Sequence, residues 1–108
     1  MTANKLDAEK PRLDLIDYSF LEGLGQVLAF GAKKYEAHNW RKGLDISRLI
    51  AAAMRHTGQF NNGQTLDDES CLCHLYHAAA NLMMASWMLQ NKPELDNRWK
   101  NNNASESL

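Results

Sequence analysis

The sequence predicts an all-α domain built from three main helices and a short helix near its C-terminus. Apolar residues recur at every third or fourth position through three long stretches, which is the spacing of one helix face. No stretch alternates convincingly between apolar and polar residues, as a half-buried strand would. The 108 residues, of which 44% are hydrophobic and 23% charged, indicate one globular domain. We expect this domain to span residues 1–100.

The first helix is predicted over residues 19–34, after a polar arm that Pro11 interrupts. Gly23, Gly25 and Gly31 each weaken a helix by about 1 kcal/mol relative to Ala. Tertiary packing must therefore hold this helix, and the glycines permit close helix approach. Its expected apolar stripe consists of Phe20, Leu21, Leu24, Val27, Leu28 and Tyr35.

The second helix follows a loop over residues 36–44. It is predicted to start near Asp45 or Ser47, because both residue types favour the N-cap position, and to continue to about Phe60. The sequence Asn61-Asn62-Gly63 then stops it. His56 is expected at the edge of a core stripe formed by Leu49, Ile50, Ala53, Met54, Thr57 and Phe60.

The third helix is predicted over residues 71–90, after an acidic loop in which Asp68 or Ser70 could serve as the cap. Pro93 then starts the short terminal helix, and the polar tail over residues 101–108 is predicted to be disordered. One strip of the third helix is an ordinary core stripe of Leu72, Leu75, Tyr76, Ala79, Leu82, Met83 and Trp87.

A second strip on the third helix holds His74, His77 and Asn81, at i, i+3 and i+7. Met84 and Met88 lie above this strip, so we expect it to be partly enclosed. Enclosed polar side chains must either be satisfied by partners or serve a function. This strip is therefore where we look for a site.

Composition excludes several functional classes. The net charge of −1 gives no field that would attract nucleic acid, and no apolar run approaches the roughly 20 residues of a membrane span. The polar start does not resemble a secretory signal. Cys71 and Cys73 are too close along a helix to bridge. We expect a cytoplasmic protein with reduced thiols that binds neither nucleic acid nor membranes.

A metal site is the first candidate for chemistry. His56, His74 and His77 could combine with the carboxylates of the first helix and the acidic loop, Glu22, Asp67 and Glu69. Imidazole and carboxylate groups are ligands for Mn, Zn or Fe, whereas carboxylates alone suit Mg. The alternative is that the histidines are structural and hydrogen-bond to the backbone or to Asn81.

Three other patterns in the sequence could carry chemistry. The pattern Cys71-x-Cys73-His74-x-x-His77 has residue types that bind zinc, but its spacing differs from that of zinc fingers and ribbons. A His-Asp phosphohydrolase dyad is disfavoured, because Thr57 follows His56 and Ala78 follows His77. The basic and aromatic run over residues 33–43 could bind phosphates and stack on a base, or it could be a solvated loop whose Trp40 plugs the core.

Several motifs follow one another along the chain, beginning with Lys10-x-Arg12-x-Asp14-Leu15. They continue through Phe30-Gly31-Ala32-Lys33-Lys34-Tyr35, His38-Asn39-Trp40-Arg41-Lys42-Gly43, Arg55-His56, Asp67-x-Glu69-Ser70 and His74-Leu75-x-His77-Ala78. Taken in this order, over about residues 10–88, these motifs resemble the phage and prophage dATP/dGTP diphosphohydrolase domain family.

This family is similar to the MazG-like all-α nucleotide pyrophosphohydrolases. The resemblance implies a helical bundle that assembles as a homodimer or higher homo-oligomer, in the host cytoplasm if the protein is phage-encoded. It implies hydrolysis of a purine deoxynucleoside triphosphate to the monophosphate and pyrophosphate, with Mg²⁺ or Mn²⁺. The MazG pattern of Glu-x-x-Glu and Glu-x-x-Asp is replaced here by His56-x-x-Gln59 and His74-x-x-His77.

On this resemblance we assign roles to the candidate residues. The expected metal ligands are Glu22, His56, Asp67, Glu69, His74 and His77, with His74 behind the others and Glu22, His56 and Glu69 also catalytic. The expected substrate-binding residues are Lys10, Arg12, Lys33, Arg41, Lys42 and Arg55 for phosphates, Tyr35, Asn39 and Trp40 for base or ribose, and Asn81 as an orienting group. The alternatives are a nucleotide-binding protein that does not cleave, or a helical assembly module.

Overall fold

The computed structural model describes residues 3–6 and 8–101, and it is all-helical, as predicted. Its three α-helices are α1 (Tyr18–Lys34), α2 (Ile46–Asn61) and α3 (His74–Asn91). Three short 3-10 helices, η1 (Leu13–Leu15), η2 (Asn39–Lys42) and η3 (Pro93–Leu95), join or flank them. The described residues form no strand, and the isolated bridge between Leu66 and Cys73 closes the loop before α3.

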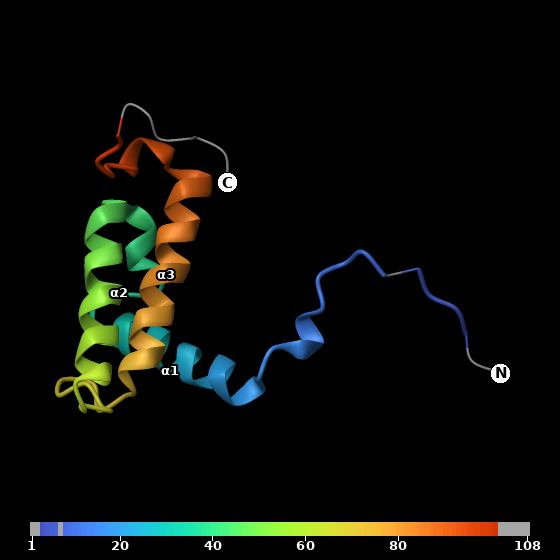
Figure 1. Ribbon diagram of the computed structural model, residues 1–108, viewed down its shortest axis with the longest axis horizontal. Helices are drawn as coiled ribbons and strands as arrows, with labels where there is room; N and C mark the ends of the chain where they lie inside the picture. Colours follow the sequence, from blue (N-terminus) through green and yellow to red (C-terminus); the bar gives the residue numbers. More distant parts are fainter. Residues whose placement is uncertain (1–2, 7, 102–108) are drawn as a thin grey trace.

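The helices α2 and α3 lie side by side and antiparallel, and they form the main body of the domain (Figure 1). Their shared core contains Ile46 and Leu49 from α2 and Ala85 and Met88 from α3. Trp40 of η2 packs against this core and meets Trp87 edge to face, with ring centroids 5.2 Å apart. The packing of Trp40 agrees with the alternative interpretation of the basic and aromatic run, in which this side chain fills the core.

The helix α1 crosses behind this pair and packs on α3 (Figure 1). Asp17 caps it by accepting a hydrogen bond from the Phe20 amide at 2.9 Å. Gly23 is buried where the Tyr76 ring of α3 lies against it, and a Cβ atom at this position would overlap that ring. The expected close helix approach is thus confirmed at Gly23.

The start of α3 differs from the prediction, because the helix begins at His74 and its N-cap is Cys73. Asp67 instead organises the preceding loop, where its Oδ2 atom accepts from the amides of Glu69 and Ser70. Cys71 takes a left-handed conformation, with φ 60°, that cannot continue into a helix. Local turn hydrogen bonds of Asp67 therefore outcompete an earlier helix start.

The predicted core stripes are only partly right. In α1 the buried residues are Gly23 and Val27, whereas Leu21 and Tyr35 are exposed. In α2 Met54 is exposed and Thr57 is at the surface, while Ile46 is buried. In α3 Leu75 and Leu82 are exposed, and the buried residues are His74, Ala78, Ala80, Ala85 and Met88.

The buried face of α3 differs from the predicted stripe because α1 and α2 both pack closely against this helix. Small alanine side chains on α3 allow α2 and α1 to approach, so the histidine strip is turned inward with them. The larger leucines are left on the outer side. The expectation that the histidine strip is partly enclosed is confirmed, because His74 is 1% exposed and His77 and Asn81 are half-buried.

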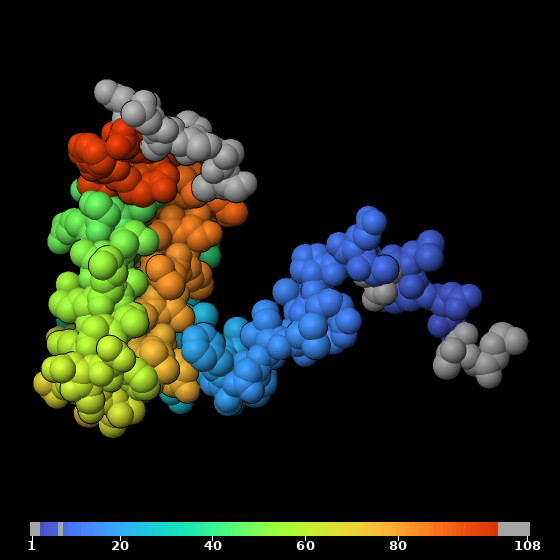
Figure 2. Space-filling model, viewed as in Figure 1, coloured from blue at the N-terminus to red at the C-terminus, as the bar shows by residue number. Residues whose placement is uncertain are grey.

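The segment before α1 extends away from the three helices (Figures 1 and 2). Its apolar side chains Leu13 and Leu15 are both exposed. At the other end, the tail predicted to be disordered lies outside the described residues from position 102 onward. In the described part of the chain, no helix has the length and apolar character needed to cross a membrane.

Candidate functional site

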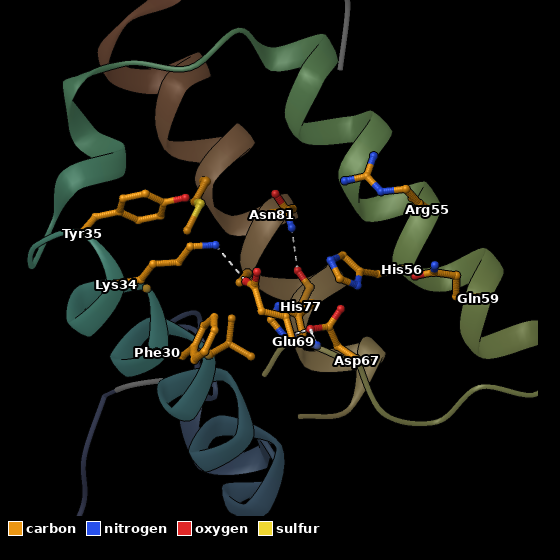
Figure 3. A pocket seen from close by; sticks show the side chains of 14 residues that line it. Phe30, Lys34, Tyr35, Arg55, His56, Gln59, Asp67, Glu69, His77 and Asn81 are labelled. Carbon is orange, nitrogen blue, oxygen red and sulfur yellow. Dashed lines mark hydrogen bonds and ion pairs between the residues drawn. The ribbon is translucent and has the colours of Figure 1, made fainter. Parts of the chain in front are cut away.

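A pocket of about 400 Å³ lies where α1, α2, α3 and the acidic loop meet (Figure 3). We call it the histidine pocket. Its polar lining residues are Lys34 from α1 and the C-cap residue Tyr35, Arg55, His56 and Gln59 from α2, Asp67 and Glu69 from the loop, and His77 and Asn81 from α3. The pocket therefore depends on the packing of all three helices.

A chain of hydrogen bonds beneath the pocket determines which nitrogen of His56 carries a proton. The Gln64 amide nitrogen donates to Asp68, so its Oε1 atom accepts from the Nε2–H of His74 at 3.1 Å. In the neutral form of His74 the Nδ1 atom is then an acceptor, and it receives the Nδ1–H of His56 at 2.8 Å. This leaves the Nε2 atom of His56 with its lone pair.

His77 is oriented by a second set of contacts. The Ser70 hydroxyl donates to Asp67 Oδ2 at 3.1 Å, so its oxygen accepts from the Nε2–H of His77 at 2.6 Å. The Nδ1 atom of His77 therefore keeps its lone pair. The His77 ring stacks on the His56 ring with centroids 4.6 Å apart. The two histidines thus present neutral nitrogen acceptors side by side.

Burial keeps both of these histidines neutral. The pKa of His56 lies below its ordinary value because the ring is removed from solvent and lies beside His77 and His74. The pKa of His77 is lowered by burial, which outweighs the opposing charge of Asp67. For Asp67, burial favours the neutral acid, but the hydrogen bonds from Ser70 and the nearby imidazoles bring its pKa below the ordinary value. Near pH 7 the pocket therefore holds two neutral imidazoles and a carboxylate.

Two basic side chains enter the histidine pocket from opposite sides, Lys34 from α1 and Arg55 from α2 (Figure 3). The Lys34 ammonium pairs with Glu69 at 2.8 Å. Both side chains of this pair are largely exposed, so the pair is worth little and can be exchanged for another anion. The pocket therefore offers positive charge beside its nitrogen and carboxylate acceptors.

Three side chains of types that can ligate a metal ion lie close together. Ligand atoms of His56, Asp67 and His74 lie within 4.8 Å of one another. His74 is buried, and both of its ring nitrogens are held by protein partners, so it orients His56 from behind. His77 contributes a further nitrogen acceptor at the wall of the pocket. This group contains no cysteine, and both cysteines are free thiols.

A second pocket of about 640 Å³ adjoins the first. We call it the aromatic pocket, because Tyr35, His38 and Trp40 line it together with apolar residues of α1 and α3. The two pockets share four lining residues, which are Val27, Gly31, Tyr35 and Met84.

A sequence profile described as dATP/dGTP diphosphohydrolase, N-terminal, matches residues 1–98. The chain belongs to this family. A curated protein named dATP/dGTP diphosphohydrolase, from Salmonella phage PMBT28, is 44% identical to it over 98 residues. No solved structure shows significant similarity to the chain.

The matched region covers 91% of this chain and 33% of the phage protein. This member of the dATP/dGTP diphosphohydrolase N-terminal family therefore spans about a third of the length of that relative. The resemblance inferred from the sequence motifs is confirmed.

The structure gathers most of the predicted site residues of this family member. His56, Asp67, Glu69, His77, Arg55, Asn81 and Tyr35 line the histidine pocket. Tyr35, Asn39, Trp40 and Arg41 line the aromatic pocket. His74 does not line either pocket, and it hydrogen-bonds His56 through its Nδ1 atom.

Other predicted residues of the family member lie elsewhere. Glu22 and Lys33 are exposed on α1 and are not among the residues that line either pocket. Lys10 and Arg12 lie on the extended N-terminal arm, where Arg12 pairs with Asp14 at 2.8 Å. Lys42 of η2 pairs with Glu36 and does not line either pocket.

Sequence reasoning missed several residues of the site. Lys34 was passed over for Lys33, although a helix advances by about 100° per residue and only one of two neighbours can face the pocket. Gln64 hydrogen-bonds His74, and Ser70 hydrogen-bonds His77. Both lie in the loop, where no periodic pattern shows which way a side chain points. The i, i+4 spacing of Phe30 and Lys34 is a signal that could have identified the lysine.

Proposed function

We propose that this chain hydrolyses dATP or dGTP to the nucleoside monophosphate and pyrophosphate at the histidine pocket. The observation that carries the proposal is the joining of two neutral imidazoles and two carboxylates with Lys34 and Arg55 in one pocket. Metal ligands and phosphate-binding cations are the two sets of groups that nucleotide hydrolysis needs. The names of the family and of the phage relative support this reaction.

The residues fit a divalent ion, and Mn²⁺ suits them better than Mg²⁺. Mixed nitrogen and oxygen donors favour Mn²⁺ or another transition ion, whereas Mg²⁺ prefers oxygen alone. His56 Nε2, Asp67 and His77 would hold the ion, with His74 and Ser70 fixing the rings. When bound, the ion supplies positive charge to the phosphates and lowers the pKa of nearby water.

The two cations of the pocket would bind the triphosphate. Arg55 can hold two phosphate oxygens in a fork, and Lys34 acts as a point charge. Because Lys34 is paired with Glu69, an arriving phosphate group would take over the ammonium. Substrate binding would therefore release the Glu69 carboxylate inside the pocket.

We propose that Glu69 then acts as the general base. It would take a proton from water while the water oxygen forms a bond to the α-phosphorus. The bond between that phosphorus and the oxygen of the β-phosphate breaks, and pyrophosphate leaves with the electron pair. Lys34 and Arg55 would offset the charge that develops on the phosphate oxygens.

A product assay tests the proposal. The purified chain is incubated with dATP, dGTP, dCTP and dTTP in Mn²⁺ and then in Mg²⁺, and the products are separated by chromatography. We expect monophosphate and pyrophosphate from the purine substrates. Arg55→Ala is expected to lose most of this activity, and Arg48→Ala is the matched control, since Arg48 lies on the same helix outside both pockets.

Two results would contradict the proposal. Nucleoside and tripolyphosphate as products would move the reaction to a different bond. If the folded chain binds dATP but forms no product with either metal, it is a nucleotide-binding domain that does not cleave. The catalytic groups of the longer relative would then lie in the two thirds of its length that this chain does not match.

A further inference from the structure

Gly31 lies at the border between the histidine pocket and the aromatic pocket. Phe30 and Lys34 line only the histidine pocket, whereas Leu28 and Ala32 line only the aromatic pocket. At about 100° per residue, Gly31 falls between these two pairs on the surface of α1. Of the two α1 residues that line both pockets, Val27 and Gly31, only Gly31 has no side chain.

Packing does not explain this glycine. A Cβ atom at Gly31 would meet no atom within 4 Å, whereas at Gly23 it would overlap the Tyr76 ring. Gly31 also lies inside a regular helix, where glycine is less favourable than alanine. A side chain here is compatible with the fold, so the space beside Gly31 is open, and we call this space the passage.

The two pockets differ in the chemistry that they offer. The histidine pocket is lined by the basic Lys34 and Arg55 together with imidazole and carboxylate groups. The aromatic pocket is lined by Leu28, Met83 and Met84, and also by Tyr35 and Asn39. A nucleoside triphosphate has the same division, because its phosphates are charged while its base is flat and largely apolar on its faces.

We infer that the two pockets form one nucleotide site, in which the purine base lies in the aromatic pocket and the chain of sugar and phosphates passes over Gly31. The volume of about 640 Å³ falls within the range of small-molecule sites. Gly31 is then a specificity-determining residue, because it admits ligands that extend through both pockets. This inference rests on the proposed function for the identity of the ligand.

Binding measurements on the full chain with Mn²⁺ test the inference. The probes are the α,β-methylene analogue of dATP, which cannot be cleaved at that bond, and inorganic tripolyphosphate. Gly31→Leu should close the passage and weaken binding of the dATP analogue by roughly tenfold or more, the loss of a base stacking interaction. Tripolyphosphate, which needs only the histidine pocket, should bind as it does to the wild type.

Gly25→Leu is the matched control. Gly25 lies on the same helix, a Cβ atom there also meets nothing within 4 Å, and it lines neither pocket. This variant should bind both probes like the wild type. Ala32→Leu is a second variant that fills only the aromatic pocket, and it should weaken only the dATP analogue. It decides the question if Gly31→Leu fails to fold by circular dichroism.

Three outcomes would overturn the inference. The first is that the wild type binds the dATP analogue and tripolyphosphate with equal affinity. The second is that Gly31→Leu and Ala32→Leu bind the analogue as the wild type does. The third is that these variants lose affinity for both probes to the same extent. These outcomes are separable from a failure of the proposed function. Hydrolysis of dATP at wild-type rate and affinity by Gly31→Leu would refute the inference alone, whereas selective binding without hydrolysis would refute the proposed reaction alone.

Discussion

The protonation of His56 is set by residues that lie outside the pocket. Its Nε2 lone pair depends on His74, which in turn depends on the oxygen of Gln64. Such supporting hydrogen bonds orient a metal ligand and raise its basicity. The free nitrogen of His56 therefore depends on a chain of hydrogen bonds through His74 and Gln64, which we call the relay.

Gln64→Leu tests this relay. The variant removes the oxygen that accepts from the Nε2–H of His74. His74 can then carry its proton on Nδ1, and in this tautomer its Nδ1 atom no longer accepts from His56. We expect Mn²⁺ affinity to fall by about 10- to 100-fold. Isothermal titration calorimetry with Mn²⁺ measures the effect, with Gln26→Leu on the exposed surface of α1 as the control. Wild-type affinity in Gln64→Leu would show that the relay does not set the site.

The stability of the metal-free chain should depend on pH through the same histidines. The pKa values of His56 and His77 are lowered by burial, so between their folded values and the ordinary value of 6.5 the unfolded chain binds more protons. The free energy of unfolding should therefore be constant above this window and fall as pH drops below 6.5. Urea unfolding with a chelator, at pH 7.5, 6.5 and 5.5, measures it.

Two variants serve as controls for this pH dependence. His38 is an exposed histidine with a left-handed backbone conformation, which asparagine also tolerates. The variant His38→Asn should therefore show the same dependence of stability on pH as the wild type. His77→Asn should flatten the profile. Stability that stays level or rises from pH 7.5 to 5.5 would contradict the account.

At the scale of the elements, the helices could be predicted but their inward faces could not. Apolar periodicity and the Asp45 and Asn61-Asn62-Gly63 signals place α1 and α2 within about a residue of their observed ends. The start of α3 was misplaced because the Asp67 turn and the left-handed Cys71 are local features without periodicity. The stripe of α3 was misjudged because alanines, which carry a weak apolar signal, decide how closely its neighbours approach.

The approach of α1 to α3 gives a prediction for two glycines of the same helix. Gly23→Ala should destabilise the chain, since overlap with Tyr76 costs about 1–3 kcal/mol and exceeds the gain in helix propensity. Gly25→Ala, where the added Cβ atom meets nothing, should stabilise it by up to about 1 kcal/mol. Urea unfolding of both variants compares them. Equal stabilisation would refute the close packing at Gly23.

At the scale of the whole molecule, much of the candidate site was predictable from residue types and motif order. The histidines, the acidic loop and Arg55 were named from the sequence, and the structure brings them together. The sequence could not show which basic residues line the histidine pocket, because charge alone does not show which side of an element a residue occupies. Lys34 and Arg55 line it, whereas the basic residues of the arm and Lys42 of η2 do not. The adjoining aromatic pocket depends on contacts among distant segments.

The predicted homo-oligomer has a physical basis on the surface. Leu75, Leu82 and Leu89 are exposed on α3 at intervals of seven residues, and α3 contains no charged residue. Light scattering should give a mass above that of the 12.3 kDa chain. Leu82→Glu should lower that mass, whereas Gln26→Glu should not. A monomeric wild type would refute the prediction.

The most direct test of the central claim is hydrolysis of dATP in ¹⁸O-labelled water with Mn²⁺, by the wild type and by His56→Asn. The account predicts ¹⁸O in the monophosphate, because water attacks the α-phosphorus, and loss of the reaction in the variant. Label in the pyrophosphate, release of tripolyphosphate, or equal activity of the variant would contradict it.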